Sequence, residues 1–228
     1  MYENRSYSLY ALVFSLVALS AAHAASPVTP AAAKAPLASS FPGPLWQVVN
    51  PNGGTASVSN GHLFLNVPGG SNHEALLTAN EAVQVVQAIG NVDFDISIKI
   101  DSPLVATDSS TSEGLMVLAD AKDFITFAVG TNGTSISLSA HTVTGGVAAT
   151  VFDDTSFREY QTPLYLRLSR TGTAYVAYYS VDGVVWTEAA SFTNGRVPTL
   201  IGPFASNYNP TPAKAVPVVM AVNWFNIL

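Results

Sequence analysis

Residues 163–187, PLYLRLSRTGTAYVAYYSVDGVVWT, constrain the fold more than any other stretch, because two turn signals divide their alternating apolar and polar residues. Alternation with a period of two is typical of strands with one buried face. Thr171-Gly172 and Asp182-Gly183 each supply a residue pair that tolerates the positive φ angles of two-residue hairpin loops. We therefore expect three antiparallel strands joined by two tight hairpins.

These loops also predict which side chains lie opposite each other across the hairpins. Leu168 is expected opposite Tyr175, and Leu164 opposite Tyr179. Tyr179 is in turn expected opposite Trp186 across the second hairpin. The face that carries these residues is predicted to be core.

The opposite face of the same strands carries three residues suited to binding a sugar: Tyr165, Arg167 and Tyr178. Aromatic rings stack on the apolar faces of sugar rings, and a guanidinium donates several hydrogen bonds. The alternative is that tyrosine is simply common on half-exposed strand faces. We interpret this trio as a candidate carbohydrate-binding face.

The rest of the chain also divides into short strand-like runs separated by Gly, Pro, Asn or Asp. They cover residues 45–49, 55–59, 62–67, 83–89, 93–101, 113–119, 124–129, 135–142, 147–152, 200–205 and 216–227. No convincing helix pattern interrupts them. The pattern predicts an all-β fold, a two-sheet antiparallel jelly-roll sandwich.

Composition and charge narrow the choice of partner. The chain has 48% hydrophobic and 11% charged residues, which suits a single domain with a sizeable core. Its net charge of −6 and only nine Lys and Arg argue against nucleic acid, which is bound by clustered cationic side chains.

The start of the chain resembles an export signal. Residues 1–24 combine Arg5, an apolar run and a small-x-small cleavage site at Ala22-His23-Ala24. Residues 25–40 form an Ala/Pro-rich tether, and residues 41–228 are taken as one domain. We expect a secreted or extracellular protein, with the periplasm as an alternative, and no membrane span after cleavage. The chain has no Cys, so it has neither disulfides nor a cysteine to carry a lipid.

The order of several short motifs resembles the concanavalin A-like lectin/glucanase superfamily. The motifs are Trp46, Asn60-Gly61-His62-Leu63-Phe64-Leu65, Asp93-Phe94-Asp95, Glu113-Gly114-Leu115-Met116-Val117, Leu166-Arg167-Leu168-Ser169-Arg170, Ser180-Val181-Asp182-Gly183-Val184-Val185-Trp186 and Trp224-Phe225. The chain looks most like the regulation-of-enolase-like group and the C-terminal domain of β-xylosidases. This resemblance implies a concanavalin A-like jelly roll with adjacent termini, and carbohydrate recognition as the commonest role.

The sequence favours a protein without catalytic activity. Glycoside hydrolysis ordinarily needs two carboxylates across a groove, and catalytic glucanases of the superfamily carry them in a Glu-x-Asp-x-x-Glu pattern that this chain lacks. Asp93 and Asp95 share a face that is better explained as solvated, whereas Glu113 and Asp120 fall on opposite faces of a strand. The histidines show neither zinc-site nor triad spacing, so no cofactor is predicted.

Two loops are candidate edges of a binding groove. One contains His73 and Glu74 within residues 68–74, and the other contains Asn207 and Tyr208. Both offer oxygen ligands, but their acidic density is too low to predict calcium.

We therefore expect an exported, lectin-like sandwich that binds a carbohydrate or cell-surface glycan through one sheet face and its rim loops. One alternative is a structural or adhesive surface protein that meets another protein or a second copy of itself. Another is a glycoside hydrolase or lyase of the same fold.

Overall fold

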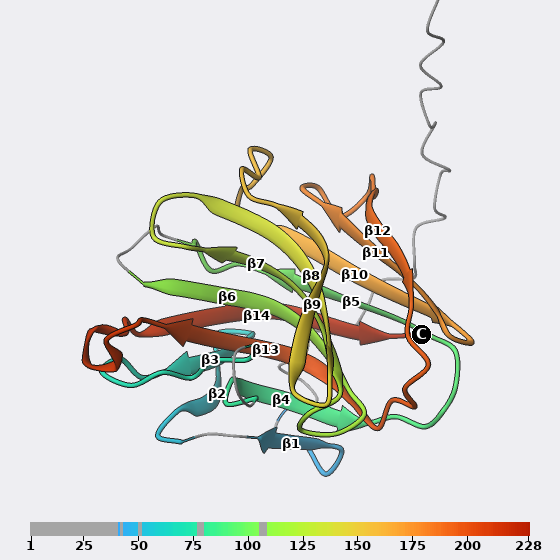
Figure 1. Ribbon diagram of the computed structural model, residues 1–228, viewed down its shortest axis with the longest axis horizontal. Helices are drawn as coiled ribbons and strands as arrows, with labels where there is room; N and C mark the ends of the chain where they lie inside the picture. Colours follow the sequence, from blue (N-terminus) through green and yellow to red (C-terminus); the bar gives the residue numbers. More distant parts are fainter. Residues whose placement is uncertain (1–40, 42, 50–51, 77–79, 105–108) are drawn as a thin grey trace, which may run out of the picture.

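The computed structural model describes residues 41, 43–49, 52–76, 80–104 and 109–228 (Figure 1). The signal peptide expected at residues 1–24 and the tether expected at residues 25–40 lie outside the described residues.

The described residues form two seven-stranded antiparallel sheets packed face to face as a jelly-roll sandwich, which confirms the predicted fold class (Figure 1). Sheet 1 contains, in spatial order, β1 (Trp46–Val49), β4 (Val83–Ala88), β13 (Leu200–Tyr208), β6 (Ser110–Leu118), β7 (Phe124–Thr131), β8 (Ile136–Thr144) and β9 (Val147–Asp154). Sheet 2 contains β12 (Thr187–Thr193), β11 (Ala174–Ser180), β10 (Leu164–Thr171), β5 (Phe94–Ile100), β14 (Val218–Ile227), β3 (His62–Val67) and β2 (Thr55–Ser59). Helix is limited, within the described ranges, to one 3-10 turn at Pro212–Lys214, and none there is long and apolar enough to span a bilayer.

The main core lies between the sheets and follows from strand alternation. In β5, four alternate residues point into the core, as the sequence predicts: Phe94, Ile96, Ile98 and Ile100. Near the two ends of the described chain, the rings of Trp46 and Phe225 meet edge to face at 5.4 Å. The start of β1 and the end of β14 therefore lie close together although they belong to different sheets, in agreement with the adjacent domain ends that the family resemblance implied.

A second, smaller apolar cluster lies on the outer face of sheet 1. It includes Met116, Phe204 and Val86, packed with Ala75 and Ala82. Sheet 1 is thus covered on part of its outer face and open on the rest.

The first predicted hairpin has the right faces but the wrong register. Thr171 lies opposite Ala174, so the two-residue loop is Gly172-Thr173, and Leu168 lies opposite Ala177 and not Tyr175. The shift is by two residues, and side chains on a strand alternate with the same period. The leucines of β10 therefore still face the core.

The second predicted hairpin is wrong, because six residues separate β11 from β12. Asp182 Oδ1 accepts the backbone N–H groups of Val184 and Val185, both at 2.8 Å, and this holds a wider turn. Tyr179 consequently lies opposite Thr187. Trp186 is outside the core, with its ring 5.8 Å from the Arg167 guanidinium carbon.

Candidate functional site

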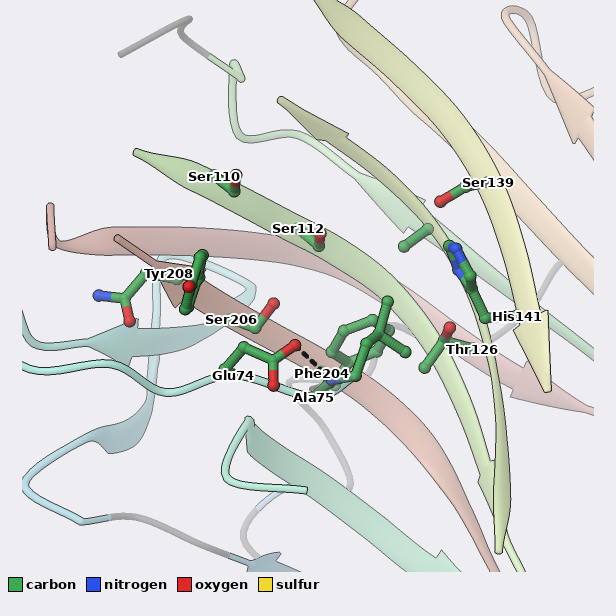
Figure 2. Close-up of a pocket in the computed structure, with 13 residues that line it drawn as sticks. Glu74, Ala75, Ser110, Ser112, Thr126, Ser139, His141, Phe204, Ser206 and Tyr208 are labelled. Carbon is green, nitrogen blue, oxygen red and sulfur yellow. Dashed lines mark hydrogen bonds between the residues drawn. The ribbon is translucent and has the colours of Figure 1, made fainter. Parts of the chain in front are cut away.

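A groove lies on the uncovered part of the outer face of sheet 1 (Figure 2). Four neighbouring strands, β13, β6, β7 and β8, form its floor, and the segment from Glu74 to Leu76 forms one wall. Its volume is about 230 Å³, which is several times the roughly 30 Å³ that one water molecule occupies in the liquid. The groove is therefore large enough to admit a small organic ring.

Strand register places hydroxyl groups side by side along this floor. Ser110 lies opposite Tyr208, and Ser112 lies opposite Ser206. Alternation directs these side chains outward, whereas Glu113, the residue after Ser112, points between the sheets. Thr126 on β7 and Ser139 on β8 contribute two further hydroxyls to the lining of the groove.

Gly114 lies on β6 between two residues that line the groove, Phe204 on β13 and Ala128 on β7. A Cβ atom at Gly114 would lie 2.2 Å from the carbonyl oxygen of Phe127, so no other residue fits there without a backbone shift. The packing of β6 against β7 therefore requires glycine at this position.

A carboxylic acid, Glu74, and an imidazole, His141, line the groove. The carboxylate of Glu74 accepts a hydrogen bond from the backbone N–H of Leu76, which fixes the wall of the groove (Figure 2). Burial lowers the pKa of His141 below its usual value, although Asp153 nearby partly opposes the shift. His141 is consequently neutral near pH 7 and can both donate and accept a hydrogen bond. None of the described lining residues is Lys or Arg.

Of the four loop residues that the sequence suggested, two line the groove with partly exposed side chains: Glu74 and Tyr208. His73 and Asn207 are each only 1% exposed. The Asn207 side chain accepts the backbone N–H of His73 and donates to the carbonyl oxygens of Pro68 and Val216. His73 and Asn207 therefore join the loop to β13, and their polar groups largely bond to the protein itself.

The trio predicted on the central hairpin lies on the outer face of sheet 2. The Arg167 side chain makes a bidentate ion pair with Asp95, with Nε 2.8 Å from each carboxylate oxygen. Its guanidinium carbon is 5.2 Å from the Tyr178 ring centroid. Tyr165 lies 6.0 Å from Trp224 between ring centroids and is packed closely against Gly183. All three residues of the trio are half-buried.

The residues suggested by the sequence therefore do not form one site. The trio lies on the outer face of sheet 2, Glu74 and Tyr208 lie at the groove on sheet 1, and His73 and Asn207 are buried. Sequence reasoning missed most of the groove floor: Ser110, Ser112, Thr126, Ser139, His141 and Ser206. The alternation of serines in residues 110–112 and 137–139 was a visible signal. It had no meaning, however, until the strand order brought those runs together.

Carboxylates are sparse at this site. Among the groove residues that the structure describes, Glu74 is the one carboxylate, whereas glycoside hydrolysis ordinarily uses two that lie roughly 5 to 10 Å apart. Glu113 is 3% exposed, and burial raises its pKa to about 8, although a hydrogen bond from Ser102 partly opposes the shift. It points between the sheets and away from the groove. In the described part of the chain, no three His, Cys, Asp or Glu side chains are grouped to hold a metal ion.

No protein-family model and no curated protein matches the sequence. Solved structures match in fold. A variant of the GH43 protein BlXynB from Bacillus licheniformis superposes with a TM-score of 0.64 at 17% identity, over 80% of this chain and 36% of that one. A xylan β-1,4-xylosidase from Bacillus halodurans superposes with a TM-score of 0.59 at 14% identity, over 75% of this chain and 34% of that one. A functionally unknown protein from Saccharomyces cerevisiae superposes with a TM-score of 0.62 at 13% identity, over 76% of this chain and 91% of that one.

These similarities concern the fold, since all three identities are low. The chain spans about a third of the length of the two bacterial proteins. It spans most of the yeast protein. The chain is therefore an all-β, two-sheet sandwich with the same fold as part of these GH43 and xylosidase proteins.

Proposed function

We propose that the protein is exported and binds a neutral carbohydrate without cleaving it, in the groove on the outer face of sheet 1. The observation that carries the proposal is the chemistry of the groove. None of the described residues that line the groove is cationic. Six of them carry hydroxyl groups: Ser110, Ser112, Thr126, Ser139, Ser206 and Tyr208.

Hydroxyl groups suit a polyhydroxylated ligand because each can donate one hydrogen bond and accept others. Such a surface matches sugar hydroxyls in either direction. A phosphate or carboxylate ligand would instead favour Arg or Lys. The partly exposed ring of Tyr208 provides an apolar surface for the face of a sugar ring.

The fold neighbours guide the choice of probe. One of them is named as a xylan β-1,4-xylosidase, so soluble xylan fragments are sensible first ligands, with cello-oligosaccharides for comparison. This choice rests on analogy of fold, whereas the proposal itself rests on the groove.

The competing position is the trio Tyr165, Arg167 and Tyr178 on sheet 2. Calorimetric titration with xylan fragments separates the two faces when Tyr208→Ala and Ser112→Leu are compared with Tyr178→Ala. We expect the two groove variants to bind at least about tenfold more weakly, a loss of about 1.4 kcal/mol. Tyr178→Ala should bind like the unaltered protein, and all variants should melt cooperatively.

Loss of binding in Tyr178→Ala alone would move the site to sheet 2. Absence of binding to any neutral glycan on an array would overturn the proposal and favour an adhesive surface protein. Product analysis on the same glycans tests the remaining alternative, a glycoside hydrolase or lyase, because cleavage would show that the protein is an enzyme.

A further inference from the structure

Strand β9 (Val147–Asp154) is the outer edge of sheet 1, and β8 is its neighbour in the sheet (Figure 1). Its first four residues are exposed, with 72% of Val147 accessible to solvent. An edge strand presents a row of backbone N–H and C=O groups with which another strand can pair.

The other edge strands show the protection that proteins normally use. β1 has four residues and β2 has five, so both are short. β12 has seven residues and carries the exposed charge of Glu188. β9 has eight residues, and its pairing with β8 is regular from Val147 to Thr150, before a bulge at Val151. Its sequence contains no Gly or Pro and no charge before Asp153.

The uncharged stretch is longer than the strand itself. Residues 138–152 contain no Asp, Glu, Lys or Arg, in a chain whose net charge is −6. The one titratable side chain in that stretch, His141, has a lowered pKa and is neutral near pH 7. Charge repulsion between two copies of this acidic protein is therefore low along this edge.

We propose that β9 pairs in antiparallel fashion with β9 of a second copy of this chain, so that sheet 1 continues across a homodimer. Pairing centred on Ala148 and Ala149 brings the small, exposed residues of both copies together. In that arrangement Asp153 and Asp154 lie beyond the paired segment. Parallel, in-register pairing would instead place each aspartate beside the same aspartate of the second chain, which is unfavourable because like charges repel.

The dimer would place two grooves on one continuous face, a consequence that rests on the proposed function. Thr150 lies opposite His141, so the outer face of β9 continues the groove floor toward the edge. A polysaccharide long enough to cross the dimer axis would then engage both grooves and bind more tightly than a short fragment.

Sedimentation velocity of the full chain over a concentration series, without glycan, tests the dimer directly. We expect a monomer–dimer equilibrium for the unaltered protein and a monomer for Ala149→Lys, because an edge lysine blocks strand pairing. Ser57→Lys, at an exposed position on the edge strand β2, is the matched control and should still dimerise. Hydrogen exchange should show β9 amides gaining protection as the concentration rises.

The proposal would be overturned if the unaltered protein were a monomer at every concentration, or if Ala149→Lys dimerised as well as the unaltered protein. A dimer whose β9 amides gain no protection from exchange would also overturn it. These results are independent of glycan binding. A groove variant such as Ser112→Leu that dimerises normally but binds no glycan would leave the dimer standing, and a monomer that binds glycan would refute the dimer alone.

Discussion

The buried carboxylic acid of Glu113 should make the stability of the protein depend on pH, and Glu113→Gln should remove that dependence. Glu113 is 3% exposed between the sheets. Ser102 Oγ donates to its Oε2 at 2.6 Å and accepts the backbone N–H of Ala221 at 3.0 Å. Burial disfavours the charged carboxylate and raises the pKa of Glu113 from 4.5 to about 8. The folded protein therefore holds a proton there at neutral pH.

The sign of the pH dependence follows from this proton. Between pH 4.5 and about 8 the folded chain binds one more proton at Glu113 than the unfolded chain does, so the free energy of unfolding falls as pH rises. The contribution is fully present below pH 4.5 and is lost as the pH passes about 8. At about 1.4 kcal/mol per pH unit, the loss is about 5 kcal/mol.

Urea unfolding measured from about pH 5 to about pH 9 can detect a change of this size. Glu113→Gln keeps the shape and removes the titration, so the variant should lack this fall in stability. The difference between the two proteins is the informative quantity, since the lowered pKa values of His73 and His141 give the opposite slope at acid pH. Glu188→Gln, at an exposed position on β12, is the control and should retain the slope of the unaltered protein. Parallel pH profiles for Glu113→Gln and the unaltered protein would refute the reasoning.

Two further predictions concern positions that shape the groove and its wall. Gly114→Ala should destabilise the fold by about 3 kcal/mol in urea unfolding, because its Cβ would lie 2.2 Å from the carbonyl oxygen of Phe127. Gly90→Ala is the control, since a Cβ added at Gly90 would have no neighbouring atom within 4 Å. Equal stability of the two variants would contradict the close packing at Gly114. Asn207→Ala should lower stability by about 3 kcal/mol, because it leaves the buried N–H of His73 without its side-chain acceptor and two carbonyl oxygens without a donor. A change in unfolding free energy below about 0.5 kcal/mol would show that this junction is not structural.

The strand content was readable from the sequence because each strand carries a local pattern. The alternation from Phe94 to Ile100 gave the buried face of β5 correctly. The Asp182-Gly183 pair misled because the same residues close a two-residue hairpin or a wider turn. The wider turn forms here, since the Asp182 side chain accepts the N–H groups of both Val184 and Val185. That choice moved Trp186 from the expected core to the outer face.

The groove could not be predicted from the sequence, because it depends on the order of the strands in sheet 1. Ser112 and Ser206 are far apart in sequence and lie opposite each other only because β13 inserts between β4 and β6. The outward direction of each serine followed from alternation, whereas the neighbour across the strand did not. Long-range pairing therefore creates the site from residues that look unremarkable along the chain.

The two outer faces differ in what a ligand would have to displace. On sheet 2, Arg167 already donates through Nε and Nη2 to Asp95, and Lys99 forms an ion pair with Asp101 at 3.1 Å. A sugar that used Arg167 there would compete with a bidentate, half-buried ion pair, which is among the stronger polar contacts in proteins. On sheet 1 the proposed ligand would instead meet serine hydroxyls, for which the exchange of water for sugar costs little. Glycan binding is therefore expected on sheet 1 even though sheet 2 carries more aromatic rings.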